Sequence, residues 1–178
     1  LPNGTWSFTD YIDDDGFGVG PIPIVTTLTK EGDALYADFT GTGPQAKGAI
    51  NPVKATSEGM VYAALKTALG AVGAEIPNTS GYFRPVTMHM PPGSFINPNP
   101  PAPVAARSMG CIRLFQSIMG AFAQMLPQAI PACSGGSEYG SGISGYDKSK
   151  TPWKPWIQMD FANETAIGGF SYKDGTDA

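Results

Sequence analysis

The segment from Arg84 to Leu126 constrains the fold more than any other part of the chain. A short apolar run ends at Met90, residues 91–103 are dense in proline, and Val104 to Leu126 form the longest periodic apolar run. Each proline lacks an N–H and clashes with a preceding helical turn, so residues 91–103 cannot form a helix interior. The segment therefore predicts a strand, a rigid extended loop and a buried helix. The loop suits either the wall of an interface or pocket, or a plain structural connector.

The last part of this segment predicts a helix from Ala105 to Leu126. Its main apolar stripe consists of Cys111, Phe115, Ile118, Phe122 and Met125, and other apolar residues fill much of the remaining surface. A helix that is apolar nearly all round is buried. Gly110 and Gly120 each cost about 1 kcal/mol of helix stability relative to Ala, which indicates close approach by a neighbouring backbone.

The N-terminal part alternates as antiparallel strands do. Residues 4–12 alternate with a period of two and predict a strand with one buried side, which ends at Asp13. Two further alternating runs flank a turn at residues 30–33, in which Gly32 can adopt positive φ, so they predict a hairpin. The buried faces of this hairpin are expected to carry Ile22, Ile24, Thr26 and Leu28, then Leu35, Ala37 and Phe39.

A second helix is expected after Pro52, with Thr56 or Ser57 as its N-cap and Glu58 in its first turn. Its apolar positions are Val61, Leu65, Ala68, Leu69 and Val72. Residues 133–145 are rich in Gly and Ser and predict a surface loop, whereas residues 153–161 alternate as a strand. The sequence shows no repeat and no domain boundary. It therefore predicts one loop-rich α+β domain of antiparallel strands packed with two main helices.

Composition excludes several classes of protein. The net charge is −4 and no basic cluster occurs, so the chain is not expected to bind nucleic acid. No uninterrupted apolar run is long enough for a membrane helix, and the first residues lack the pattern of a signal peptide. We therefore expect a cytoplasmic protein, and the missing initiator Met suggests a processed chain or a fragment. Only 15% of residues are charged, which fits a piece covered by partners.

Few residues in the sequence are candidates for catalysis or for metal binding. His89 is the only histidine, and a hydrogen-bonded structural role is favoured over a catalytic one. Residues 13–16 lack EF-hand spacing and indicate a solvated turn rather than a calcium site. Cys111 fits the buried helix as a small hydrophobe, and a disulfide with Cys133 is the less favoured alternative.

Nucleotide and nucleophile motifs are also missing. No Walker A pattern occurs, and Gly142 to Gly145 misses the Gly-x-Ser-x-Gly elbow by one position. Residues 135–145 can present N–H groups to an anion, although a flexible surface loop is favoured. We therefore expect the chain alone to catalyse neither hydrolysis nor phosphoryl transfer.

Several short phrases stand out between residues 36 and 107. They are Tyr36–Thr42, Gly48–Pro52, Gly81–Val86, Pro92–Ser94, Asn97–Pro98, Pro101–Val104 and Arg107. In this order and spacing they resemble the hydantoinase B/oxoprolinase family over residues 10–135, and the tail resembles it poorly. The resemblance implies that residues 1–178 are part of a hydantoinase B/oxoprolinase-like domain.

The resemblance also implies cofactors and partners. The family includes B-type subunits of ATP-dependent N-methylhydantoinases, the matching half of 5-oxoprolinases, and large subunits of acetone and acetophenone carboxylases. Such subunits work with a hydantoinase A-like partner, which binds ATP and phosphorylates the amide or enolate oxygen of the substrate. Further subunits of the same complex are implied. A divalent metal is expected outside this stretch, because the family's metal-binding His and Asp residues lie mainly in an N-terminal part without a counterpart here.

No catalytic or metal-binding residue carries over from the family. Asp38, Asn51, Arg84 and Arg107 occupy matching positions and are candidates to line the substrate pocket or the subunit interface. The alternative, which we favour, is that each braces a loop through hydrogen bonds to the backbone.

Two functions stay open at this point. The chain is a portion of a large subunit of a multi-subunit ATP-dependent enzyme, which acts on a cyclic amide or carboxylates a ketone and is inactive as this chain alone. The atypical tail leans toward the carboxylase. Alternatively, it is a non-catalytic structural or assembly subunit of such a complex. We also expect the isolated chain to aggregate or to be poorly stable, because its apolar surface needs cover.

Overall fold

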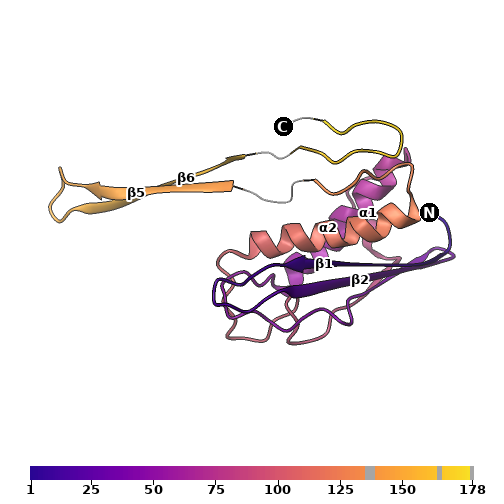
Figure 1. Ribbon diagram of the computed structural model, residues 1–178, viewed down its shortest axis with the longest axis horizontal. Coiled ribbons are helices and arrows are strands. Elements are labelled where there is room, and N and C mark those ends of the chain that lie inside the picture. The colour runs from indigo at the N-terminus through magenta and orange to yellow at the C-terminus, as the bar shows by residue number, and fades with distance from the viewer. Residues whose placement is uncertain (135–138, 164–165, 177–178) are drawn as a thin grey trace.

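Figure 1 shows the computed structural model of the chain, which describes residues 1–134, 139–163 and 166–176. One sheet contains β1 (Gly4–Ile12), β2 (Ile22–Glu31), β3 (Ala34–Asp38) and β4 (Val86–His89), in that order. The helices are α1 (Lys54–Ala71) and α2 (Arg107–Met125), with a 3₁₀ turn, η1, at Ser80–Phe83. A separate two-stranded sheet contains β5 (Tyr139–Asp147) and β6 (Lys154–Asn163). The predicted α+β class is confirmed.

The hairpin of β2 and β3 is confirmed in its turn and in its buried face. Gly32 adopts a φ of +54° in the turn, where a side chain would be strained. The inward residues are all buried, namely Ile22, Ile24, Thr26, Leu28, Leu35, Ala37 and Phe39. The strict alternation of β2 fixes its register, because a slip of one residue would turn this whole set toward solvent.

The pairing of β3 with β4 departs from the antiparallel expectation. These two strands run parallel, with Leu35 opposite Val86 and Asp38 opposite His89. Parallel strands need a long crossover connection, and here the chain between them contains α1 and η1. Both strands therefore end at the same edge of the sheet, which places the segments after Asp38 and His89 side by side.

The start of α1 differs from the prediction. The helix begins at Lys54, and the carbonyl of Val53 accepts hydrogen bonds from the N–H groups of Thr56 and Ser57. Neither hydroxyl caps the helix, because Thr56 Oγ1 donates to Val53 O and Ser57 Oγ donates to Ile96 O. Glu58 lies beyond the first turn and faces Lys54, with Oε1 3.7 Å from Nζ. Among the predicted apolar positions of α1, Val61, Leu65 and Ala68 are buried, Leu69 is half-buried and Val72 is exposed.

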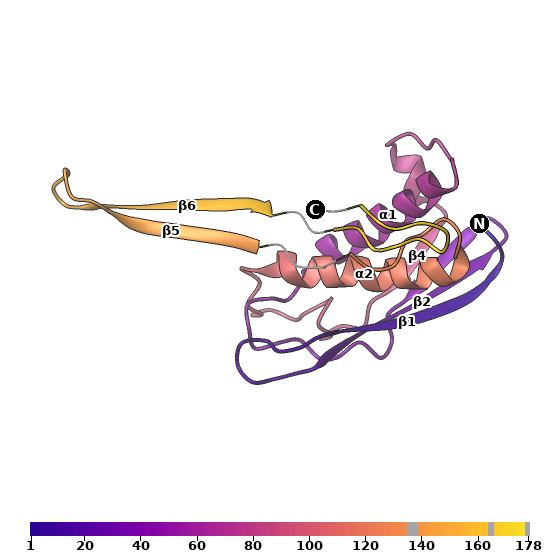
Figure 2. The ribbon, with the colours of Figure 1, turned by 45° about the horizontal axis from the view of Figure 1, so that its top comes forward.

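Helix α2 lies over one face of the sheet, where it packs on β1, β2 and α1 (Figure 2). The predicted close approach at Gly110 is confirmed, since a Cβ there would lie 2.5 Å from the Ile50 carbonyl oxygen. At Gly120 the neighbour is a side chain, the ring of Phe8, rather than backbone. Ser117 adds a buried polar link, with its Oγ 2.9 Å from Thr26 Oγ1. Within the described residues, no helix is long and apolar enough to cross a membrane.

The proline-rich loop contributes to the core instead of merely connecting β4 to α2. Phe95 and Ile96 are fully buried in the same apolar cluster as Phe39 and Phe122. The Ile96 carbonyl also accepts the hydrogen bond of Ser57 in α1. The loop is therefore a packed layer of the domain.

The C-terminal part contains the largest error of the sequence prediction. Residues 139–147, expected as part of a Gly/Ser-rich loop, form β5 and pair with β6 in a long hairpin. Gly145 lies opposite Trp156, whose indole covers the bare glycine backbone. The N–H groups of residues 139–145 therefore belong to a strand rather than to an anion-binding loop. Residues 135–138 lie outside the described residues.

Candidate functional site: a loop layer at the carboxyl ends of β3 and β4

Three loops meet where the parallel strands β3 and β4 end. We call residues 13–21, 39–53 and 90–106 the loop layer. Backbone hydrogen bonds join the last two loops, since Gln45 N donates to Gly93 O at 2.9 Å and Phe95 N donates to Gly43 O at 2.8 Å. In open sheets, ligands bind outside the carboxyl ends of parallel strands. The loop layer is therefore the candidate functional site.

Asn51 holds the loop layer together from its centre. The side chain is fully buried, and its Oδ1 accepts from Ala46 N at 2.7 Å. Its Nδ2 donates to the carbonyls of Ala46, Gly48 and Pro103 at 2.9–3.2 Å. A buried amide must have its polar groups paired, and here the backbone supplies the partners. Asn51 therefore braces two loops and has no donor left for a substrate.

Asp15 connects the third loop to the same place. Its carboxylate accepts backbone N–H bonds from Phe17 and Val19 on Oδ1, and from Lys47 and Gly48 on Oδ2, at 2.9–3.2 Å. Burial raises the pKa of Asp15, but these four hydrogen bonds outweigh it and hold the pKa below its ordinary value. The prediction of a solvated turn is wrong for Asp15, which is only 4% exposed.

Asp13 and Asp14, in contrast, are exposed as the sequence predicted. Four donors already surround the Asp15 carboxylate, so it is not presented to a metal ion. Among the described residues, no group of three or more His, Cys, Asp and Glu side chains could hold a metal. The residues present in this part of the chain therefore do not fit a divalent cation.

Asp38 and His89 lie opposite each other at the ends of β3 and β4. The Asp38 carboxylate accepts bonds from the N–H and the hydroxyl of Thr40, at 2.9 and 2.7 Å. Burial raises the pKa of Asp38, but the Thr40 bonds and the nearby His89 together lower it below its ordinary value. His89 is exposed, and among the described residues no hydrogen bond fixes its imidazole. The expected hydrogen-bonded structural role is therefore not found.

The two candidate arginines lie far apart along the fold. Arg107 begins α2 next to the loop layer, and its guanidinium is exposed, with NH1 3.4 Å from the Val104 carbonyl oxygen. The neighbouring Ala106 N donates to Ala49 O at 2.7 Å, so Arg107 is near the loop that contains Asn51. Arg84 is exposed at the start of β4, the opposite end from the loop layer. The structure thus brings Asn51 and Arg107 to one site and excludes Arg84 from it.

Ser94 adds a polar group that sequence reasoning missed. Its Oγ is buried in the loop layer and has no hydrogen-bond partner among the described residues. Unpaired buried hydroxyls are uncommon, because each one costs free energy. The Pro92–Ser94 phrase marked this position in the sequence, but nothing in that phrase indicated that the hydroxyl would be unpaired.

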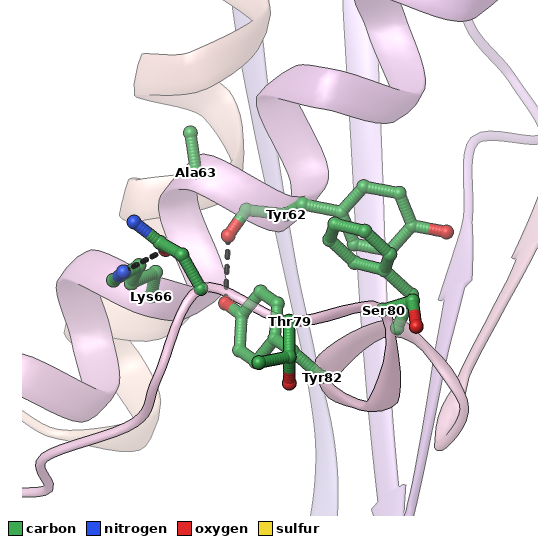
Figure 3. A pocket seen from close by; sticks show the side chains of 8 residues that line it. Tyr62, Ala63, Lys66, Thr79, Ser80 and Tyr82 are labelled. Carbon is green, nitrogen blue, oxygen red and sulfur yellow. Dashed lines mark hydrogen bonds between the residues drawn. The ribbon is translucent and has the colours of Figure 1, made fainter.

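A pocket of about 390 Å³ lies at the other end of α1, as Figure 3 shows. Tyr62 of α1 and Tyr82 and Phe83 of η1 form its aromatic wall, with the Tyr62 and Phe83 ring centroids 4.1 Å apart. Tyr82 Oη donates to the Tyr62 carbonyl at 2.7 Å, and burial raises the pKa of Tyr82 to about 12. Lys66 donates to Asn78 across the rim. This pocket is near Arg84 and away from the loop layer.

A second polar cluster links α2 to β1 and to the start of the C-terminal region. Arg113 NH1 is 3.3 Å from Asp10 Oδ2 and 3.0 Å from Gln116 Oε1. Gln116 also pairs with Ser134 and with the thiol of Cys133. Burial and the charge of Asp10 raise the pKa of Cys133, although Arg113 partly opposes them. Both cysteines are free thiols, so the alternative of a disulfide is not found.

Comparison with known proteins identifies the family. The family model described as hydantoinase B/oxoprolinase matches residues 1–178. A Pseudomonas sp. (strain NS671) protein, named as the B-type subunit of a D-/L-hydantoinase, is 32% identical over 100% of this chain and 30% of its own length. A 5-oxoprolinase of Pestalotiopsis fici is 32% identical over 75% of this chain and 10% of its own length.

A solved structure shows the same fold. An ATP-dependent caprolactamase from Pseudomonas jessenii superposes with a TM-score of 0.72 and 24% identity, over 87% of this chain and 26% of that chain. The present chain thus spans less than a third of the length of each of these proteins. The match of the family model along its whole length shows that this chain belongs to the hydantoinase B/oxoprolinase family.

Proposed function

We propose that the chain is a portion of the large, B-type subunit of a multi-subunit ATP-dependent enzyme that opens a cyclic amide. The match of the hydantoinase B/oxoprolinase model to residues 1–178 carries this proposal. The names of the two relatives in sequence, a hydantoinase subunit and a 5-oxoprolinase, support a cyclic amide as the substrate class. Ketone carboxylation becomes the second candidate, because neither name supports it and the family model matches the tail that we expected to be atypical.

A cyclic amide needs activation because its carbonyl is a poor electrophile. ATP, bound by a hydantoinase A-like partner, would supply a phosphoryl group to the amide oxygen and leave as ADP. Water would then add to the carbon, the ring C–N bond would break, and phosphate would leave. We assign ATP to the partner subunit because membership of the hydantoinase B/oxoprolinase family implies a hydantoinase A-like partner that binds it.

The contribution of this chain would be to position the loops around the substrate. The side chains of Asn51 and Asp15 form hydrogen bonds with backbone groups of these loops, so both act as positioning residues. Arg107 and Asp38 remain candidates to contact the substrate or the partner at the loop layer. Arg84, at the opposite end of β4, is a candidate for a subunit contact only. A divalent metal, if the enzyme uses one, would be held outside this stretch.

Reconstitution with an A-like partner tests this function. We expect ADP release from ATP to require both proteins and a hydantoin, 5-oxoproline or caprolactam. Replacing Arg107 with Ala should raise KM or lower kcat, whereas Arg84→Ala should leave both unchanged once the complex has formed. ADP release that requires bicarbonate and a ketone instead would show a carboxylase, and turnover by the 178-residue chain alone would contradict the proposal.

A structural or assembly role is the alternative function. The side chains of Asn51 and Asp15 use all their hydrogen bonds on backbone groups. This arrangement favours a structural role, because a rigid scaffold needs it as much as a substrate site does. In that case Arg107→Ala and Asp38→Asn would change the affinity for the partner subunit and leave kcat and KM of the assembled complex unchanged. The cytoplasmic location and the poor stability of the isolated chain stay predictions.

A further inference from the structure

The chain leaves the domain to form the β5–β6 hairpin and returns to the place where it left. Ala132 precedes the hairpin and Gly169 follows it, and Ala132 N donates a hydrogen bond to Gly169 O at 2.8 Å. We call residues 128–132 and 167–176, which meet here, the clasp. Residues 133–168 therefore form a closed excursion, and Figures 1 and 2 show its two strands extending away from the sheet and the helices.

The entry to the hairpin is fixed to α2. Ile130 is buried in the core cluster, and its N–H donates to Leu126 O at the end of the helix, at 3.1 Å. Further along, the Cys133 thiol donates to Gln116 Oε1 at 2.8 Å, and Gln116 Nε2 donates to Ser134 Oγ at 3.2 Å. Helix α2 therefore holds the chain as far as Ser134.

The return from the hairpin is fixed to the other side of the clasp. Ser171 Oγ donates to Gln128 Oε1 at 2.8 Å, which joins the returning chain to the segment after α2. The two backbones approach so closely that a Cβ at Gly168 would lie 2.2 Å from the Ala132 carbonyl oxygen. Only glycine leaves room for this contact, so the sequence itself favours a closed base.

The hairpin beyond the clasp makes its contacts within itself. Strands β5 and β6 pack chiefly on each other. Among the described residues, the side-chain contacts of the hairpin also stay inside it, such as the Ser149 Oγ bond to Asp147 Oδ1 at 2.6 Å and the packing of Lys148 over the Trp153 ring. The apolar core contains no described side chain of β5 or β6. The sheet and the helices therefore form their core without the hairpin.

We propose that the hairpin is an inserted arm, which the rest of the fold carries but does not need, and which unfolds and refolds while the clasp stays closed. An isolated two-stranded hairpin is marginally stable in water at best. Elements with few contacts to a core open with a smaller free energy than the whole protein. The clasp separates this opening from the core, because it fixes both ends of the excursion. This inference does not depend on the proposed enzymatic function.

Removing the arm tests whether the fold needs it. In this variant of the 178-residue chain, a Gly-Ser-Gly-Ser linker, which spans up to about 13 Å, replaces residues 135–166. The clasp already holds the two ends together, and a shorter closed loop costs less entropy. The midpoint of thermal unfolding should therefore stay within about 2 °C of the native value or rise. A fall of more than about 4 °C would show that the hairpin supports the fold, and would overturn the proposal.

A pair of glycine variants tests the clasp. Gly168→Ala places a Cβ against the Ala132 carbonyl oxygen and should lower the midpoint of thermal unfolding by at least about 2 °C. Gly169→Ala is the matched control, because the nearest atom to its Cβ would be the Lys173 carbonyl oxygen, at an ordinary 3.8 Å. That control should leave the midpoint unchanged. Equal midpoints for the two variants would mean that the clasp does not close the base of the arm, and the inference would be wrong.

Hydrogen exchange on the intact chain tests the separate opening of the arm, and its result does not depend on whether the deletion variant folds. After correction for intrinsic rates, the amides of residues 142–145 and 156–159 should exchange at least about tenfold faster than those of residues 114–122 in α2. Equal rates in the two regions, with the same dependence on urea, would show that the hairpin and the helix open together. That result would also overturn the proposal.

Discussion

The four-stranded sheet with its two helices and loops, which we call the domain body, differs from the β5–β6 hairpin in how its polar and apolar groups are paired. In the body, buried Asn51 and Asp15 find backbone partners from segments distant in sequence, and the core closes over Phe39, Phe95 and Phe122. In the hairpin, the strands pair locally and the apolar side chains Ile143 and Ile157 stay exposed. The body therefore buries these groups through its own contacts, whereas the described part of the chain leaves the hairpin's apolar side chains exposed.

The largest expected difference is between two isoleucines. Ile118 in α2 is fully buried and Ile157 in β6 is 69% exposed. Replacing Ile118 with Ala should lower the free energy of unfolding by about 2–5 kcal/mol through lost packing and a cavity. The change Ile157→Ala should alter it by less than about 0.5 kcal/mol in dilute solution. Urea denaturation of both variants measures the difference, and equal losses would show that the hairpin belongs to the cooperative core.

Next in size is the contribution of Asn51 to the loop layer. Replacing it with Ala leaves four backbone groups without their partner, so we expect a loss of about 2–4 kcal/mol in unfolding free energy. The matched control is Asn97→Ala, because Asn97 Nδ2 makes one such bond, to Met90 O at 2.8 Å. That control should cost about 1 kcal/mol by the same measurement. Similar costs for both variants would contradict a central role for Asn51.

A glycine pair tests the close approach of α2 to the loop layer. Gly110→Ala would place a Cβ against the Ile50 carbonyl and the Pro52 ring, and should cost about 1–3 kcal/mol by overpacking. Gly59 in α1 has open space around it, so Gly59→Ala should stabilise the protein by up to about 1 kcal/mol through helix propensity. Thermal unfolding compares the two, and stabilisation by both would mean that the loop can move away from α2.

The smallest expected effect is the pH-dependent part of the contribution of Asp15. Its pKa in the folded chain lies below the ordinary value of 3.8, so this contribution is complete above that pH and is lost as pH falls through the folded pKa. The stability difference between the native chain and Asp15→Asn should therefore shrink in acid below about pH 4. Acid titrations of unfolding free energy measure it, with Asp14→Asn as the exposed control. A difference independent of pH would contradict the four-bond arrangement.

The sequence correctly predicted the helices and strands that are determined by the pattern of neighbouring residues. The alternation of β2 and the glycine turn at Gly32 placed the hairpin correctly, and the all-round apolar pattern placed α2 within two residues at its start. It failed where distant partners decide the outcome. Asp15 sits in an ordinary acidic turn, and only the N–H groups of Lys47 and Gly48 make it a buried anchor.

Glycine content explains the other main failure. Residues 139–147 resemble a loop because Gly and Ser have low strand propensity, yet β6 supplies Trp156 to cover Gly145. The sequence named Asn51 and Arg107 as candidates, and the structure places Asn51 in the loop layer and Arg107 next to it, while their role stays a prediction. No local pattern could have separated them from Arg84, because that distinction depends on the direction of β4.

The parallel pairing of β3 with β4 also sets an order in which the domain can form. Strands β1, β2 and β3 follow one another through short connections and can pair early, because closing a short loop costs little entropy. Strand β4 can join only after α1 has docked and the long excursion has closed. Until then the edge of β3 is open, so we expect the loop layer to be the last region to acquire protection from hydrogen exchange during refolding.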